Sequence, residues 1–237
     1  MNDLQPEQAP VNPVVVCEGV SQVYETATGR VWALREVDAA FGAGRLSVVA
    51  GPSGSGKSSL LRILGGLDRP AQGSVRVAGV EMADAPARTR RLLQREVIAN
   101  VFQEPASNLL AYLDVQSHLD LWRRLRRLPS TPADPYLEAV GLSHRARAVP
   151  GTLSGGEQQR LALAAAVAAQ PRVVLTDEPT SQLDRSSASA VIEALLRLRD
   201  LGATLVVASH DPDLLEAADA AVVLDHGIVV AGAGSGR

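Results

Sequence analysis

The sequence predicts an α/β fold in which a parallel β-sheet is covered by helices on both faces. In the last third of the chain, short apolar strands alternate with helices, and parallel strands need such a crossover between them. Further upstream, an apolar strand runs into a glycine-rich turn that opens a helix, which is another strand–helix unit. At 237 residues, with 46% apolar and 21% charged residues, the chain can bury the core of one large domain.

The first half of the chain is predicted to be mostly β-structure. Its strands are short apolar segments rich in β-branched residues, and they are Val14–Val20, Trp32–Phe41, Arg45–Ala50, Ser74–Val77 and Ile98–Phe102. One helix, Lys57–Leu64, follows the glycine-rich segment Gly51–Gly56. Over residues 114–149 the pattern becomes helical, with breaks at Pro129, Pro132 and Pro135.

The last third carries the strand–helix alternation. The helices are Gly155–Gln170, Ser186–Asp200 and Pro212–Ala217, and the strands are Arg172–Thr176, Thr204–Ser209 and Ala220–Leu224. In such a sheet, ligands bind beside the carboxyl ends of the strands. The segments at the two ends, residues 1–13 and 231–237, are expected to be flexible tails around one domain at 14–230.

Composition and charge argue against several classes of protein. A net charge of −3 disfavours a nucleic-acid partner, because a phosphate backbone requires a local excess of cations. The single cysteine, Cys17, allows no internal disulfide, which fits a reducing cytoplasm. The N-terminus has no apolar signal segment, and no stretch approaches the ~18–20 apolar residues of a membrane span. A role at a membrane would therefore require a partner.

A phosphate-binding loop is predicted directly after the third strand. The pattern G-x-x-x-x-G-K-[ST] is matched, with one further serine, by Gly51, Pro52, Ser53, Gly54, Ser55, Gly56, Lys57, Ser58 and Ser59. Glycines let successive backbone N–H groups converge on one anion, and the helix adds the positive end of its dipole. Lys57, the only lysine in the chain, would reach the β- and γ-phosphates, and Ser58 would bind Mg²⁺. The alternative is a flexible turn that merely links strand to helix.

Two adjacent carboxylates follow the strand predicted at 172–176. Asp177 and Glu178 would stand at the edge of the sheet where the phosphates are expected. Asp177 would hold Mg²⁺, and Glu178 would polarise the attacking water as a general base. Alone, this pattern also fits a solvated acidic turn. Together with the glycine-rich loop, it predicts hydrolysis of ATP.

The segment Leu153–Arg160, which reads Leu-Ser-Gly-Gly-Glu-Gln-Gln-Arg, resembles the signature motif of ATP-binding cassette (ABC) proteins. Physically it is a helix start, with Ser154 as N-cap and Glu157 completing a capping box. A plain helix cap is the alternative, and both roles can hold at once. By this resemblance, the nucleotide bound to a second subunit is contacted by Ser154, Gly155, Gly156 and Glu157, so that two chains enclose each ATP.

Other segments match the same family in the same order. Tyr24 resembles the aromatic residue that stacks on adenine, and Gln103 resembles the Q-loop glutamine that senses Mg²⁺, the attacking water and the transporter partner. Asp184 matches the D-loop at the dimer interface, and His210 matches the switch histidine that contacts the γ-phosphate. Singly, three of these residues also fit an ordinary role: packing for the tyrosine, surface exposure for the glutamine, and capping or core packing for the histidine. The remaining histidines are expected to be structural; they are His118, His144 and His226.

The resemblance covers about residues 14–230 and implies a P-loop NTPase core with an N-terminal antiparallel β-subdomain and an inserted helical subdomain at about 104–155. Gly65–Pro70 and Ser209–Pro212 look most like the ATPases of lipoprotein-release and macrolide-export systems. The chain departs from that group at Ser181-Gln182, where Gly-Asn is usual, and at Ala165, where an arginine is usual. These departures touch no residue predicted to handle phosphate.

The resemblance implies the ATP-binding and ATP-hydrolysing subunit of a transporter, with ATP and Mg²⁺ as ligands. Its expected partners are a transmembrane permease subunit and a second ATP-binding subunit, either a copy of this chain or a close relative. The chain is expected to be cytoplasmic, peripheral on the inner face of the cell membrane, with export or membrane extraction favoured over import.

The alternative is a regulatory ABC ATPase that signals to a membrane partner without moving solute. An ABC ATPase of DNA repair, chromosomes or translation is a third reading, which the absence of coiled-coil insertions and zinc motifs disfavours.

The basic cluster Arg123–Arg127 falls in the predicted helical subdomain. A solvated helix face is the favoured interpretation of this cluster. The alternative is contact with anionic lipid headgroups or with acidic loops of a membrane subunit.

Overall fold

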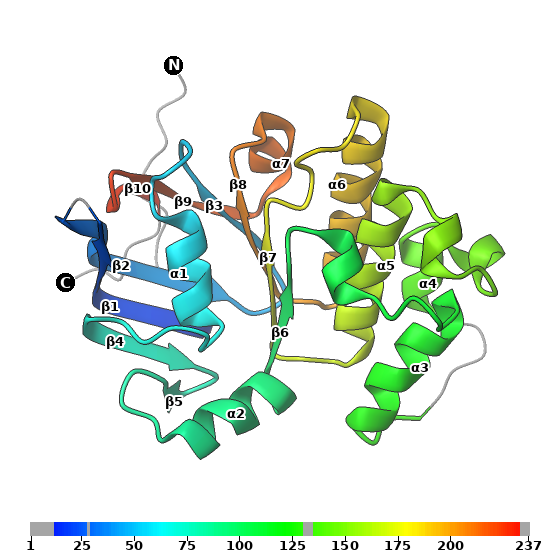
Figure 1. Cartoon of the computed structure of the whole chain (residues 1–237), viewed down its shortest axis with the longest axis horizontal. Helices are drawn as coiled ribbons and strands as arrows, with labels where there is room; N and C mark the ends of the chain where they lie inside the picture. The colour runs from blue at the N-terminus through cyan, green and yellow to red at the C-terminus, as the bar shows by residue number, and fades with distance from the viewer. Residues whose placement is uncertain (1–11, 28, 130–134, 233–237) are drawn as a thin grey trace.

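Two β-sheets and a group of helices form the structure (Figure 1), a computed structural model that describes residues 12–27, 29–129 and 135–232. The smaller sheet is antiparallel, and its order is β2 (Gly29–Gly42), β1 (Pro13–Thr26), β4 (Gln72–Val77), β5 (Val80–Glu81). The larger sheet has the order β10 (Ile228–Gly232), β9 (Ala220–Asp225), β3 (Leu46–Ala50), β8 (Leu205–Ser209), β7 (Val173–Asp177), β6 (Ile98–Val101). All its strands are parallel except β10, which pairs antiparallel with β9.

Helices connect the parallel strands, as crossovers between such strands require. They are α1 (Lys57–Leu64), α2 (Ala87–Glu96), α3 (Val115–Leu125), α4 (Pro135–Ala139), α5 (Gly155–Ala168), α6 (Arg185–Asp200) and α7 (Pro212–Ala217). Three short 3₁₀ turns lie between α2 and α5, namely η1 (Pro105–Asn108), η2 (Ser143–Arg145) and η3 (Pro150–Thr152). Residues 104–155, predicted as a helical subdomain, thus contain helices and 3₁₀ turns and no strand in their described part.

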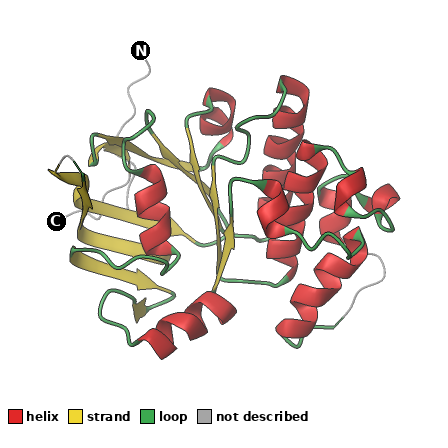
Figure 2. Cartoon of the chain, in the orientation of Figure 1, coloured by secondary structure: helices red, strands yellow, loops and turns green. Residues whose placement is uncertain are grey.

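The central strands β3, β8 and β7 are buried on both faces, which explains why they are almost continuously apolar. Val48 and Val207 face a core shared with α3, α5 and α6, whereas their neighbours Val49 and Val206 face a second core. This second core is shared with α1 and the antiparallel sheet, so α1 lies between the two sheets. Figure 2 shows the result: helices gather on one side of the six-stranded sheet, and the antiparallel sheet stands on the other. The predicted α/β fold with an antiparallel N-terminal sheet is confirmed.

The sequence missed three elements, and each lacks the pattern that would have revealed it. Helix α2 buries only Leu93 and contains few apolar residues, so little in the sequence marks it as a core-packing helix. Strand β5 has two residues, too few to form a pattern. Strand β10 is half-exposed and ends at Gly232, within a segment that was predicted to be a tail.

The limits of the predicted tails need correction. Pro13 pairs with Gly42 in the antiparallel sheet, and Ala231 pairs with Val223 in the parallel one. These residues are therefore part of the sheets, because backbone hydrogen bonds to a neighbouring strand order even a proline- or glycine-rich end. The rest of both predicted tails lies outside the described residues.

The solvated-face interpretation of Arg123–Arg127 is wrong for two of its members. Arg123 is 4% exposed, and its guanidinium lies over the ring of Tyr136, 5.5 Å from the centroid. Arg126 donates to the carbonyl oxygen of Glu96, and burial lowers its pKa below the usual value. Both side chains fold back onto the protein because their aliphatic stems can cover apolar surface while the head group bonds to an acceptor.

Among the described residues, no helix is both long and apolar enough to span a bilayer.

Thr176 offers a test of the packing beneath the site. Its hydroxyl is fully buried on the same face of β7 as Val174 and has no hydrogen-bond partner in the described part of the chain. An unsatisfied buried hydroxyl costs about 1–3 kcal/mol, so Thr176→Val is expected to raise the free energy of unfolding by about 1 kcal/mol. Denaturant unfolding measures this change.

The matched control is Thr204→Val. Thr204 is equally buried, at 7% exposed, but its Oγ1 accepts a hydrogen bond of 2.9 Å from the backbone N–H of Gly44. Its replacement removes that bond and should lower the free energy of unfolding. If both variants lost stability alike, the Thr176 hydroxyl would have to be satisfied in solution.

Candidate nucleotide-binding site

The predicted phosphate loop connects β3 to α1, and its geometry admits only glycine at two positions. Gly51 has a φ of 143°, and a Cβ there would lie 2.1 Å from the carbonyl oxygen of Leu224. Gly56 has a φ of 106°, and a Cβ there would lie 2.4 Å from the carbonyl oxygen of Ala33. The loop therefore lies tightly between β9 and β2, with its backbone close to both. The remaining loop residues run between these two fixed points; they are Pro52, Ser53, Gly54 and Ser55.

Lys57 begins α1, and its side chain folds back over the loop. Its Nζ donates to the carbonyl oxygens of Gly51, at 2.9 Å, and Pro52, at 3.1 Å. It also lies 3.4 Å from Oε1 of Glu178, and only 6% of the side chain is exposed. A buried ammonium of this kind needs partners on several sides, and the loop and the carboxylate supply them.

The carboxylate of Glu178 contacts side chains from three other parts of the site. Its carboxylate faces Nζ of Lys57 and lies 3.0 Å from Nδ1 of His210, and the Ser209 hydroxyl donates to it at 3.5 Å. Its own N–H donates to the carbonyl oxygen of Ala208 at 2.8 Å, and its φ is 46°. A left-handed conformation costs a non-glycine residue about 1–2 kcal/mol, so the backbone here is held by its surroundings. The structure thus joins three predicted residues: one begins α1, and the other two directly follow β7 and β8.

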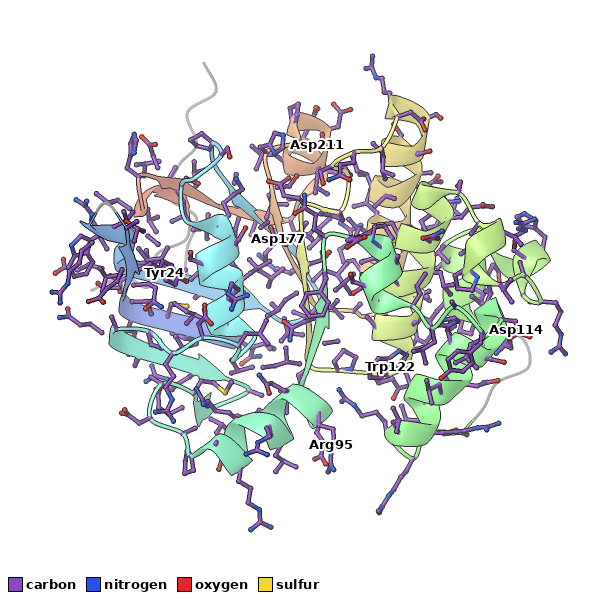
Figure 3. The ribbon with its side chains drawn as sticks, in the orientation of Figure 1. Tyr24, Arg95, Asp114, Trp122, Asp177 and Asp211 are labelled. Atoms are coloured by element: carbon purple, nitrogen blue, oxygen red, sulfur yellow. The ribbon has the colours of Figure 1, made fainter. Side chains whose placement is uncertain are left out.

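Asp177 stands at the end of β7, between the sheets and the helices (Figure 3). Burial raises its pKa above the ordinary value, and the charge of Glu178 raises it further, whereas the Ser58 hydroxyl and the Lys57 ammonium lower it. Its Oδ1 is buried and has no hydrogen-bond partner among the described residues. A buried carboxylate oxygen without a hydrogen-bond partner is suited to bind a cation.

The residues predicted to hold Mg²⁺ line one pocket. Ser58, Gln103 and Asp177 border a cavity of about 660 Å³. All three offer oxygen atoms, which Mg²⁺ prefers, and Mg²⁺ is usually held by one or two carboxylates together with substrate phosphates. These residues therefore fit Mg²⁺ bound together with ATP.

Gln103 follows β6, and its amide group forms a hydrogen bond to the loop that follows β7. Its Nε2 donates to the Ser181 hydroxyl at 3.1 Å, and that hydroxyl donates to the carbonyl oxygen of Glu178 at 2.8 Å. Sequence reasoning did not predict this role for Ser181. It also missed Ser209, which donates to Glu178 and accepts from the N–H of Asp211 at 3.1 Å. In the sequence, the only indication of a role for either serine was that it lies close to a motif residue along the chain.

The signature segment opens α5 with the predicted capping box. Ser154 Oγ accepts from the N–H of Glu157 at 3.2 Å, and the Glu157 carboxylate accepts from the N–H of Ser154 at 2.8 Å. These bonds hold the pKa of Glu157 below its usual range. Gly155 and Gly156 form the first turn of the helix. None of the hydrogen bonds described for Ser154 reaches the phosphate loop of its own chain.

The predicted D-loop packs beside the signature segment. Asp184 caps α6 and accepts bonds from the Ser186 hydroxyl, at 2.6 Å, and from the N–H of Ser187, at 3.0 Å, which lower its pKa. A Cβ on Gly156 would lie 3.0 Å from Cβ of Ser187, so the two helix starts touch. Ser154 and Asp184 therefore cap two helices whose first turns touch, and in the described part of the chain no hydrogen bond joins either residue to Lys57.

Tyr24 lies on β1 and is held by its hydroxyl. The hydroxyl donates to Oδ2 of Asp68 at 3.2 Å, and Arg62 binds the same carboxylate at 2.8 Å and holds its pKa below the ordinary value. The predicted stacking of Tyr24 on adenine stays a prediction. Its ring is visible at the sheet side of the molecule in Figure 3.

The three remaining histidines lie outside these contacts. His118 is buried, accepts from the N–H of Leu110 through Nε2 at 2.9 Å, and bonds through Nδ1 to the carbonyl oxygen of Asp114 at 2.9 Å. Burial lowers its pKa, so it is a neutral structural residue, as predicted. His144 belongs to η2, and the side chain of His226 is 94% exposed.

Three features define a nucleoside triphosphatase of the P-loop class: a glycine-rich loop after β3, a lysine that folds over this loop, and a pair of carboxylates at the end of β7. A family model described as ABC transporter matches residues 34–181. The chain belongs to the ABC transporter family and is an ATPase of that family.

Named relatives support this assignment. The chain is 37% identical over 218 residues to the lipoprotein-releasing system ATP-binding protein LolD of Bordetella pertussis, covering 91% of this chain and 94% of that protein. It is 38% identical over 223 residues to the macrolide export ATP-binding/permease protein MacB 1/2 of Paracoccus denitrificans, covering 92% of this chain. It spans only 33% of that longer relative.

Solved structures of ABC ATPases share the fold. The dimeric, post-hydrolysis ATP-binding cassette MJ0796, bound to ADP and Pi, matches with a TM-score of 0.77 at 29% identity, covering 94% of this chain and 99% of that one. A structure of cbiO1 from Clostridium perfringens, part of an ABC transporter complex, matches with a TM-score of 0.81 at 25% identity, covering 94% and 89%.

Proposed function

We propose that this chain is the ATP-hydrolysing subunit of an ABC transporter, and that two such subunits close head to tail on two Mg-ATP molecules. The observation that carries the proposal is the separation of two half-sites within one chain. Lys57 and Glu178 meet at the phosphate loop, whereas Ser154 lies at the start of α5 and contacts Glu157. A second copy would bring its own Ser154 to the first copy's phosphate loop. The dimeric cassette among the similar structures supports this arrangement.

In the proposed site, each residue acts through the atoms described above. The N–H groups of the phosphate loop and Nζ of Lys57 bind the β- and γ-phosphates. Ser58, Gln103 and Asp177 hold Mg²⁺, which neutralises charge on the phosphates when it is bound. Glu178 accepts a hydrogen bond from the attacking water and takes its proton. His210, which contacts Glu178, binds the γ-phosphate.

The second copy completes the site from the other side. Its Ser154, Gly155 and Gly156 present backbone N–H groups and a hydroxyl at a helix start, which suits the γ-phosphate. Its Asp184 caps the neighbouring helix at the same interface. Bound nucleotide stabilises the closed dimer by linkage, so hydrolysis and loss of phosphate reopen it. That closing and opening is the mechanical output delivered to a membrane subunit.

The partner is a separate transmembrane permease, which this chain meets at the inner face of the membrane, and the direction is export or extraction from the membrane. The names of the relatives, a lipoprotein-releasing system protein and a macrolide exporter, support this direction. Affinity purification of the chain from detergent-solubilised native membranes should recover a membrane protein with transport-type spans. ATP-dependent solute flux or lipoprotein release should then appear in vesicles that contain both chains. Recovery of a partner that stimulates hydrolysis without any transport would instead indicate a regulatory ATPase.

A further inference from the structure

A basic surface lies on α2 and the end of α3, and the nucleotide site does not use it. The surface consists of exposed arginines and exposed apolar side chains: Arg88, Arg91, Leu92, Arg95, Trp122, Arg124, Leu125 and Arg127. Three of its arginines, at 88, 91 and 95, are spaced by three and four residues and so share one face of α2. We call this set the α2–α3 basic surface.

The two helices are fixed against each other. The guanidinium of Arg126, at the end of α3, donates to the carbonyl oxygens of Glu96 and Ile98, which follow the last turn of α2. Figure 3 places Arg95 and Trp122 on the same side of the molecule, at the end away from Asp177 and Asp211. The ends of α2 and α3 are therefore joined through Arg126, and none of the residues of the α2–α3 basic surface belongs to the nucleotide site.

The charge of this patch is largely uncompensated. Arg95 pairs with Glu96 at 2.5 Å, but Arg88 and Arg91 have no carboxylate within 4.0 Å among the described residues. The whole chain is acidic, with a net charge of −3, so composition alone does not produce such a concentration of arginine. A local field of this kind attracts anions and is screened by salt.

Apolar side chains stand between the arginines. Trp122 is 42% exposed, Leu125 60% and Leu92 46%. A merely solvated face does not need a tryptophan and two leucines in water. Tryptophan is typical of membrane interfaces, where its ring meets the acyl boundary and its N–H meets water.

We propose that the α2–α3 basic surface binds the anionic headgroups of a lipid bilayer. Guanidinium groups form paired hydrogen bonds with phosphate, and clusters of this size on an amphipathic helix bind acidic lipid. Trp122, Leu92 and Leu125 enter the interface beneath the headgroups. This goes beyond the proposed function, because the contact requires no permease and no nucleotide.

The test uses the purified full-length chain and lipid vesicles. The chain should sediment with phosphatidylglycerol-containing vesicles, stay in solution with phosphatidylcholine vesicles, and dissociate as salt rises. Each arginine near an anionic surface contributes about fivefold to binding, so Arg88→Gln/Arg91→Gln/Arg95→Gln should lose about a hundredfold in partitioning. Glutamine resembles arginine in helix propensity, so α2 should keep its fold, which circular dichroism checks.

The matched control removes the same charge elsewhere. Arg30, Arg147 and Arg197 have side chains that are 76%, 88% and 52% exposed and lie outside the α2–α3 basic surface. The variant Arg30→Gln/Arg147→Gln/Arg197→Gln should retain vesicle binding. Equal loss in the two triple variants would show a response to net charge alone and would overturn the proposal.

A spectroscopic readout locates the contact. The chain has two tryptophans, so Trp32→Phe leaves Trp122 as the only reporter. Its emission should shift to shorter wavelength with anionic vesicles only. No shift, equal binding to neutral vesicles, or retention by RNA without vesicle binding would each refute a lipid site. ATP hydrolysis should be unchanged in the α2 triple variant, so failure here leaves the proposed function standing.

Discussion

Glu178→Gln is expected to bind ATP, to dimerise in its presence, and to lower turnover by ~10²–10⁴-fold. The amide keeps the size of the carboxylate and can still face Lys57 and His210, but it cannot take a proton from water. Hydrolysis reopens the proposed dimer, so a variant that binds without hydrolysing should accumulate as the closed form. Size-exclusion chromatography with and without Mg-ATP, together with phosphate release, measures both effects.

Glu193→Gln is the matched control. Glu193 lies on α6, its side chain is 61% exposed, and it pairs with Arg197, so the same chemical change is made outside the site. It should leave turnover unchanged and give no trapped dimer. Normal turnover in Glu178→Gln would remove Glu178 from the role of general base. A variant that stayed monomeric with ATP would contradict the two-chain site.

Lys57→Ala is expected to abolish detectable turnover and to weaken ATP binding. Loss of one partner of a buried, hydrogen-bonded charge pair costs about 2 kcal/mol or more, which is roughly thirtyfold in affinity. Titration with a fluorescent ATP analogue measures the binding, and phosphate release measures the turnover. ATP affinity equal to that of the unchanged protein would refute the phosphate contact.

Lys57→Arg separates charge from shape. The ammonium of Lys57 curls back to the carbonyl oxygens of Gly51 and Pro52 in a space that leaves it 6% exposed. A planar guanidinium has the same charge but cannot adopt that compact geometry, so the arginine variant should also lose most activity. Its recovery of full activity would mean that positive charge alone is sufficient at this position.

Local patterns predicted most of the fold. The strand–helix alternation near the carboxyl end follows from apolar runs separated by polar helices, and the helix at Lys57–Leu64 has the predicted bounds. Ser154 was predicted as an N-cap because Glu157 stands three residues later, and both bonds are present. The elements that escaped prediction, such as α2, bury too little apolar surface to produce a periodic signal.

The site was predictable as a set of residues but not as a set of contacts. Motif order placed Lys57, Glu178 and His210 near the same edge of the sheet, yet nothing local indicated that all three would touch. The Gln103–Ser181 bond joins residues 78 positions apart, and such pairings depend on how loops pack. Arg123 was misjudged for the same reason, since its partner ring belongs to Tyr136 on another helix.

The Lys57–Glu178–His210 contact has a consequence for the order of events. Lys57 and His210 both contact the carboxylate that is proposed to activate water. If Lys57 binds the γ-phosphate as proposed, that phosphate competes with Glu178 for the same ammonium. Nucleotide binding would then break the Lys57–Glu178 ion pair and leave the Glu178 carboxylate able to face the attacking water.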